Sequence, residues 1–268
     1  MPVFRRCNSC KLYNMRNFKV TIAYNGAAYH GWQRQNNAYT VQEAFEDALF
    51  ELLGEHITVN GCSRTDAGVH ARQYVLSFQT ASTITCRGVV FGLNAILEDD
   101  IAVLSCEEAP LDFHARYSCK GKEYVYIVHN SEIKDPFYKD TAYRSWYPID
   151  ADRLDREAKA FIGKHDFKTF CSADCDKENT ERTIFDFSVR RVGDTVHFTV
   201  SGDGFLYNMV RIMVGTLLYI NDGKLPDGSI ASLIDSRDRT KAGKTVPPTG
   251  LYLNEVYYDK GNEDNERQ

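Results

Sequence analysis

Residues 61–71 read GCSRTDAGVHA, a polar segment that contains Gly68 and lies between two apolar ones. The flanking residues 57–60 and 73–79 have the composition of strands, so residues 61–71 are predicted to be a loop between them. Loops that a scaffold holds in place often carry function. The first half of the chain is therefore expected to place a functional loop between two strands.

This loop holds a single carboxylate, Asp66, between Arg64 and Arg72, with His70 nearby. An ionised carboxylate can act as a nucleophile or as a base. Spacing alone favours a simpler interpretation, in which Asp66 closes an Asx turn of its own. These residues by themselves leave both interpretations open.

The rest of the chain combines strands with fewer helices. Residues 40–53 are the clearest helix, because their apolar side chains fall on one stripe, Thr40 and Glu43 form a capping box, and Gly54 follows. Hairpin-joined strands and one or two helices in each half predict an α+β fold with mainly antiparallel sheets. Further predicted strands are residues 18–24, 122–129, 184–190 and 195–201, and further predicted helices are residues 151–162 and 205–220.

The chain of 268 residues is expected to have four parts. Residues 1–14 are an N-terminal extension, residues 15–145 and 146–258 are two subdomains of similar layout, and residues 259–268 are a disordered tail. No apolar run approaches the roughly 18 residues of a membrane span, and the start lacks a signal-peptide core. We therefore expect a cytoplasmic protein without membrane contact.

The net charge of −5 argues mildly against nucleic acid as a partner. It is not decisive, because a basic groove needs only local clustering of cations. Candidates for such a groove are Arg34, Arg72, Arg116, Lys120, Lys122, Arg144, Arg182, Arg237, Arg239, Lys241 and Lys244.

Two cysteine pairs, Cys7 with Cys10 and Cys171 with Cys175, could hold zinc only if both pairs converged. Scattered cysteines in a cytosolic chain are more often free thiols, so we expect no metal. Neither a P-loop nor a GxGxxG fingerprint occurs, which agrees with a protein that needs no cofactor.

The loop sequence SRTDAGVHA resembles the active-site signature of TruA-type tRNA pseudouridine synthases. Other segments resemble the same family in the same order, so that the resemblance covers about residues 17–258. These segments are 23–35 (AYNGAAYHGWQRQ), 93–95 (LNA), 113–116 (FHAR), 122–124 (KEY), 163–167 (GKHDF), 182–184 (RTI), 204–215 (GFLYNMVRIMVG) and 242–251 (AGKTVPPTGL).

The resemblance implies a pseudouridine synthase fold, in which two similar subdomains face a central cleft. It implies a homodimer that binds tRNA and isomerises uridines in the anticodon stem-loop, at tRNA positions 38, 39 and 40. The reaction detaches uracil from ribose, rotates it and rejoins it through carbon, without a cofactor. Asp66 becomes the catalytic carboxylate, and whether it attacks the sugar, attacks the base or removes a sugar proton stays open.

The resemblance also implies roles for residues outside the loop. The K-x-Y segment assigns Tyr124 to stacking on the target uracil, while Tyr126, on the same strand face, is expected to be core packing. Arg211, in an otherwise apolar helix, is expected to be the counter-charge of Asp66. Arg64 would fill the space of an extruded nucleotide and hold a phosphate. The remaining substrate-binding candidates are His70, Arg72 and Arg116.

Two alternatives remain beside a synthase for the anticodon arm. One is a pseudouridine synthase with a broader set of RNA targets. The other is a tRNA-binding protein that has kept the fold without catalysis. Convergence of Asp66, Tyr124 and Arg211 in one cleft would favour an enzyme over the non-catalytic alternative.

Overall fold

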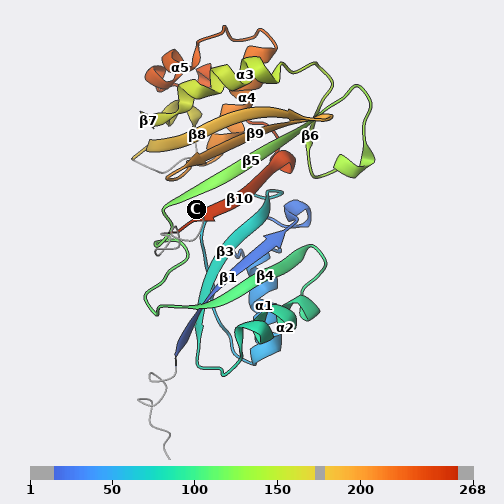
Figure 1. Cartoon of the computed structure of the whole chain (residues 1–268), viewed down its shortest axis with the longest axis vertical. Coiled ribbons are helices and arrows are strands. Elements are labelled where there is room, and N and C mark those ends of the chain that lie inside the picture. Colours follow the sequence, from blue (N-terminus) through green and yellow to red (C-terminus); the bar gives the residue numbers. More distant parts are fainter. Residues whose placement is uncertain (1–14, 173–178, 259–268) are drawn as a thin grey trace, which may run out of the picture.

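A computed structural model of the protein describes residues 15–172 and 179–258. Their strands form one sheet in the order β4-β1-β3-β10-β5-β9-β8-β7, with β2 paired to β3 and β6 paired to β5 (Figure 1). The pairs β3–β10 and β5–β6 are parallel and the others antiparallel, which confirms the α+β class with a mainly antiparallel sheet. The strands are β1 (Arg16–Tyr24), β2 (Asn60–Gly61), β3 (His70–Thr80), β4 (Ile101–Ala109), β5 (Gly121–Asn130), β6 (Tyr143–Ser145), β7 (Gly163–Asp166), β8 (Glu181–Val192), β9 (Thr195–Gly202) and β10 (Leu251–Tyr257).

The first half of the sheet, β4-β1-β3, carries α1 (Val41–Leu53) and α2 (Cys86–Ile96). The predicted start and end of α1 are confirmed, because the Thr40 side chain accepts the Glu43 N–H and Gly54 is left-handed at φ 68°. The helix buries Phe45 in the same core as Phe18 of β1. Local sequence signals are thus sufficient for this helix.

The second half of the sheet, β5-β9-β8-β7, carries α3 (Ala151–Ala158), α4 (Met209–Asn221) and α5 (Ile230–Ser236). The hairpin predicted at Gly193 is confirmed, with that glycine left-handed at φ 57° between β8 and β9. In Figure 1 these three helices lie together at the end of the molecule away from α1 and α2. Each half thus combines several strands of the sheet with helices.

The strand β10 joins the two halves into one sheet (Figure 1). It is the last strand in sequence, yet it lies between β3, to which it is parallel, and β5, to which it is antiparallel. The expected boundary at residues 145/146 does not coincide with a break in the sheet. β5 precedes that boundary but pairs with β9, which follows it.

Several predicted boundaries shift in the structure, and those near the candidate site are the most informative. Of residues 57–60 only Asn60 lies in a strand, and β3 begins at His70, so the predicted loop 61–71 shortens to residues 62–69. The helix predicted to begin at residue 205 begins at Met209, because Asn208 is left-handed at φ 60° and interrupts the helical path. No helix within residues 15–172 and 179–258 is long and apolar enough to cross a membrane.

Candidate active site

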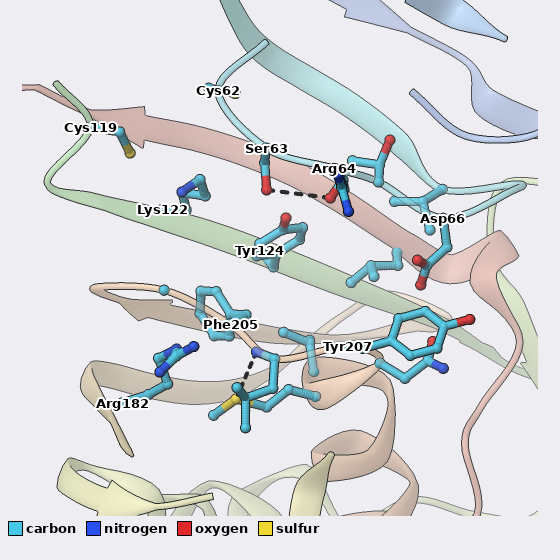
Figure 2. A pocket seen from close by; sticks show the side chains of 18 of the residues that line it. Cys62, Ser63, Arg64, Asp66, Cys119, Lys122, Tyr124, Arg182, Phe205 and Tyr207 are labelled. Carbon is cyan, nitrogen blue, oxygen red and sulfur yellow. Dashed lines mark hydrogen bonds between the residues drawn. The ribbon is translucent and has the colours of Figure 1, made fainter. Parts of the chain in front are cut away.

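A pocket of about 660 Å³ lies where the two halves of the sheet meet. Its walls come from the loop 62–69, from residues 116–124, and from the segment 203–210 that leads into α4. Figure 2 shows Tyr124 and Phe205 near its middle, with Lys122 and Arg182 toward one end and Asp66 and Tyr207 toward the other. Residues far apart in the sequence thus share one cavity.

The loop that carries Asp66 is held from behind by the first half of the protein. The Tyr24 hydroxyl and Thr65 Oγ1 are 2.9 Å apart, and Trp32 N–H donates to the Thr65 carbonyl at 3.1 Å. Gly31 is left-handed at φ 85°, and a Cβ there would lie 2.4 Å from the Thr65 carbonyl oxygen. Only glycine permits this close approach, so Gly31 allows residues 23–35 to pack directly against the loop that carries Asp66.

The carboxylate of Asp66 contacts Arg211 and does not close a turn of its own loop. Arg211 Nη1 lies 3.4 Å from Asp66 Oδ2, and no other residue of ranges 15–172 and 179–258 makes a hydrogen bond or ion pair with this carboxylate. The loop is turned by backbone instead, since Val69 N–H donates to the Asp66 carbonyl at 3.1 Å. The expected pairing of Asp66 with Arg211 is therefore present in the structure.

Arg211 reaches Asp66 from the first turn of α4, and its side chain is 14% exposed. Its Nε donates to the Val246 carbonyl at 2.7 Å, and its Nη1 donates to Asn208 Oδ1 at 2.6 Å. The segment around Val246 can lie this close because α4 has Gly215, where a Cβ would be 1.8 Å from the Lys244 carbonyl oxygen. Arg211 does not line the pocket, so it supports Asp66 from behind the wall.

Burial raises the pKa of Asp66, and the charge and hydrogen bond of Arg211 oppose this rise without cancelling it. The sequence predicted the direction of the Arg211 effect, but not that burial would be the larger one. Asp66 is still 33% exposed through its side chain and faces the pocket. A carboxylate of this kind is accessible to a ligand and poorly solvated.

Tyr124 forms the middle of the pocket wall and is 6% exposed. Its ring meets that of Phe205 edge to face, with centroids 5.1 Å apart. Burial raises the pKa of Tyr124, while a hydrogen bond with the Ser63 side chain opposes the rise. Tyr126, on the same face of β5, is fully buried and donates to the Pro247 carbonyl at 2.8 Å, which agrees with its expected role in the core.

The structure places some of the predicted basic residues in the pocket and others away from it. Arg64 and Arg116 are exposed and line the pocket. Lys122 and Arg182, from the wider set of groove candidates, also line the pocket but are half-buried. Within the described ranges none of these four has a carboxylate within 4.0 Å, and Arg182 bonds the Asn179 and Glu181 carbonyls instead. Arg34 and Arg237 are different, because they form ion pairs with Glu46 and Asp166 respectively.

The structure does not bring His70 and Arg72 into this pocket. Both ring nitrogens of His70 have backbone partners, because Nδ1 accepts the Gly26 N–H at 3.1 Å and Nε2 lies 3.2 Å from the Thr249 carbonyl. Arg72 bonds Asn254 Oδ1 at 3.3 Å and lies over the Tyr252 ring. Since both residues are in β3 rather than in the loop, the strand directs them away from Asp66.

Several pocket residues were not singled out from the sequence. Ser63, Phe205, Tyr207 and Asn208 line the pocket, and each lies within a quoted family segment or beside a predicted site residue. The described ranges contain no group of three or more His, Cys, Asp or Glu residues that could hold a metal ion. Cys7, Cys10 and Cys175 of the zinc hypothesis lie outside those ranges.

Comparison with known proteins gives one consistent match. Residues 20–118 and 158–259 match a protein family described as tRNA pseudouridine synthase. A protein of Acetivibrio thermocellus named tRNA pseudouridine synthase A is 45% identical over 244 residues, covering 91% of this chain and 100% of that protein. Another of the same name, from Ruminiclostridium cellulolyticum, is 44% identical over 245 residues with the same coverage.

Similarity to solved structures is more distant. The archaeal box H/ACA sRNP Nop10-Cbf5 complex contains a chain that aligns with a TM-score of 0.37 at 11% identity. The alignment covers 81% of this chain and 46% of the other. A Cbf5-Nop10-Gar1 complex aligns with a TM-score of 0.36 at 12% identity, over 75% of this chain and 44% of the other.

Proposed function

Because the chain belongs to the tRNA pseudouridine synthase family and therefore converts uridine to pseudouridine in tRNA, we propose that Asp66 is its catalytic carboxylate. The observation that carries this proposal is the position of Asp66. It faces a pocket walled by Tyr124, while Arg211 contacts it from behind. A carboxylate in an aromatic pocket, with a fixed counter-charge, suits an isomerisation without net redox change.

The reaction breaks one bond to the sugar and forms another, and a single carboxylate can take part in both steps. The bond between C1′ of ribose and N1 of uracil breaks, uracil rotates, and C1′ bonds to C5. The proton of C5 leaves and N1 gains one, so no atom is lost or added overall. Asp66 could serve by attacking the sugar, by attacking the base or by removing a sugar proton, and all three require it to be ionised at the start.

The uracil is proposed to enter between Tyr124 and the segment before α4. Stacking of a base on an aromatic ring contributes roughly 1–3 kcal/mol. Tyr124 is suited to this role because Phe205 braces its ring from the side. Its raised pKa keeps the hydroxyl protonated at neutral pH, so that it can donate a proton or a hydrogen bond.

The cations that line the pocket are proposed to bind the RNA backbone. Extruding a paired or stacked nucleotide costs a few kcal/mol, which phosphate contacts can offset. Arg64 is two residues from Asp66 and could fill the vacated space. Arg116, Lys122 and Arg182 line the same pocket without carboxylate partners in the described ranges, and they would contact phosphates of neighbouring nucleotides.

The proposed targets are the uridines of the anticodon stem-loop, at tRNA positions 38, 39 and 40, in the cytoplasm. A broader set of RNA targets is the alternative. The decisive experiment incubates the purified protein with tRNA transcripts that carry tritium at C5 of uridine. Tritium should appear in water because the new C1′–C5 bond displaces it, and sequencing should map the product to the anticodon arm. Absence of release would contradict the proposed activity, and equal release from unrelated RNA would favour the broader enzyme.

We further propose that the protein acts as a homodimer. Residues 131–147, which include β6, expose four large apolar side chains, a kind of surface that a protein–protein contact can bury. Their exposures are 78% for Ile133, 89% for Phe137, 57% for Trp146 and 63% for Tyr147. A second copy of the chain covering this surface would bury it and would double the area available to tRNA.

A further inference from the structure

Asn208 is the residue immediately before α4, but its side chain does not cap that helix. An asparagine there would ordinarily accept a backbone N–H from the first helical turn. Here Oδ1 accepts Arg211 Nη1 at 2.6 Å, and Nδ2 donates to Ser172 Oγ at 2.8 Å. The backbone is left-handed at φ 60°, a conformation that non-glycine residues adopt at a cost in free energy. A left-handed residue whose side chain bonds Arg211 and Ser172 in place of the helix end invites a functional explanation.

The three contacts of the Arg211 side chain are unequal. Asn208 Oδ1 and the Val246 carbonyl accept at 2.6 and 2.7 Å, whereas the Asp66 carboxylate is 3.4 Å away. Arginine and carboxylate usually approach more closely and often share two parallel hydrogen bonds. The guanidinium is thus held firmly by two neutral oxygens and loosely by the charged one.

A loose pair has a chemical consequence for Asp66. Two short bonds from Arg211 would engage both carboxylate oxygens and lower their nucleophilicity and basicity. With one long contact to Oδ2, the other oxygen has no hydrogen-bond partner among residues 15–172 and 179–258. That oxygen stays available to a substrate in the pocket, while the positive charge still lies near the carboxylate.

We propose that Asn208 is a positioning residue that restrains Arg211, so that the guanidinium balances the charge of Asp66 without engaging both of its oxygens. The inference rests on the proposed catalytic role of Asp66. It adds a residue whose side chain acts through Arg211 and need not touch the substrate. The left-handed backbone contributes to this restraint, because it turns the Asn208 side chain toward Arg211 instead of toward the N-terminus of α4.

Two substitutions of Asn208 should move the titration of Asp66 in opposite directions. Asn208→Gly keeps the left-handed backbone without strain and removes the restraint, so Arg211 can close on Asp66 and lower its pKa. Asn208→Asp supplies a rival carboxylate for Arg211 and adds negative charge, so the pKa of Asp66 should rise. Both should reduce kcat by about tenfold or more, with a smaller change in KM, since small misplacements in an active site have effects of this size.

Other charged or titrating groups near this pair are not expected to obscure the result. Tyr124 interacts electrostatically with Asp66, and Tyr126 with Arg211. Burial raises the pKa of both tyrosines, so neither titrates in the acid range. Asp203 is a second carboxylate in the wall of the same pocket, so the titration of Asp66 has to be read at its own carboxyl group.

Ser172→Ala provides the matched control. It removes the bond to Asn208 Nδ2, which Asn208→Gly also loses, and it leaves the Oδ1 contact with Arg211 in place. Its Asp66 titration should coincide with that of the wild type. If its titration moves as far as that of the Gly variant, or if the Gly variant moves to higher pH or not at all, the proposal is overturned.

The experiment should follow the Asp66 carboxyl carbon by NMR as a function of pH, in the full chain without RNA. This readout does not depend on turnover. If Asp66→Asn keeps its activity while the Asn208 variants shift the carboxyl titration as expected, the proposed catalytic role fails and the restraint stands. If Asp66→Asn is inactive and the titrations of all variants coincide, the restraint fails and the catalytic role stands.

Discussion

Arg211 Nη1 lies 3.4 Å from Asp66 Oδ2, although 145 residues separate the two in sequence. Asp66 belongs to the loop before β3 and Arg211 to the first turn of α4, so each half of the protein contributes one partner. The contact can form because β10 ties β3 to β5 and so fixes the halves relative to each other. The ion pair is therefore a property of the complete sheet.

Asp66→Asn should abolish turnover and leave the affinity for tRNA nearly unchanged. The amide cannot act as a nucleophile or base, whereas most RNA affinity comes from phosphate contacts elsewhere. Tritium release and filter binding with the same tRNA preparation measure the two quantities. Turnover within tenfold of the wild type would show that another residue performs the chemistry.

The same substitution should not destabilise the fold at neutral pH. Burial raises the pKa of Asp66 above its value in the unfolded chain, so the folded state binds the proton more tightly. The stability that protonation gives is present at low pH and is lost as the pH rises through the folded-state pKa. Thermal unfolding should therefore give Asp66→Asn a Tm at least equal to that of the wild type at pH 7, with the difference shrinking in acid. A lower Tm at pH 7 would contradict the raised pKa.

Arg211→Met should lower activity most at the acid end of the pH range. Methionine suits the apolar helix, so the fold should survive, but Asp66 loses the charge that opposes the effect of burial on its pKa. The acid limb of kcat/KM should therefore move to higher pH. Arg87→Met, an exposed arginine on α2, is the matched control and should leave the limb in place. An unaltered pH profile for the Arg211 variant would show that the Asp66–Arg211 pair does not affect catalysis.

Substitutions at Tyr124 should separate its ring from its hydroxyl. Tyr124→Leu removes the stacking surface and should cost roughly 1–3 kcal/mol of transition-state stabilisation, or about five- to 150-fold in kcat/KM. Tyr124→Phe keeps the ring and its contact with Phe205, so it isolates the contribution of the hydroxyl group. Steady-state kinetics with one tRNA substrate would measure both, and equal losses for the two variants would contradict a role in stacking.

Exhaustive chelation should leave activity unchanged. The proposed chemistry uses only Asp66 and its neighbours, and the described ranges contain no group of potential metal ligands. Activity of the dialysed protein should be compared before and after zinc is added back. A large loss that zinc restores would revive the hypothesis that Cys7, Cys10, Cys171 and Cys175 form a metal site.

Binding of tRNA should weaken steeply with salt and should require the dimer. The net charge is −5, so affinity has to come from a local basic surface, and counterion release makes such binding salt-dependent. Phe137→Asp, on the exposed apolar surface, should shift sedimentation toward the monomer and weaken tRNA binding. A wild-type monomer that binds tRNA with little salt dependence would contradict both expectations.

The sequence alone predicted those elements that are determined by residues close together in the chain. The helix α1 follows from its apolar stripe, its Thr40 cap and Gly54, all within a few turns of chain. Asp66 and Tyr124 were recognisable because their neighbours in sequence form distinctive segments. These features need no knowledge of which strand pairs with which.

The positions of His70, Asn208 and β10 depend on tertiary structure. His70 belongs to β3 because Tyr252 of β10 pairs with it, and this partner is far away in sequence. Asn208 interrupts the expected helix because its side chain bonds Arg211 and Ser172 in place of the helix end. The sequence by itself determined the family and the α+β class and singled out Asp66 as the proposed catalytic carboxylate, since short segments encode them. Only the tertiary structure decided which cations share the pocket with Asp66 and how tightly Arg211 holds it, because those distances depend on long-range strand pairing.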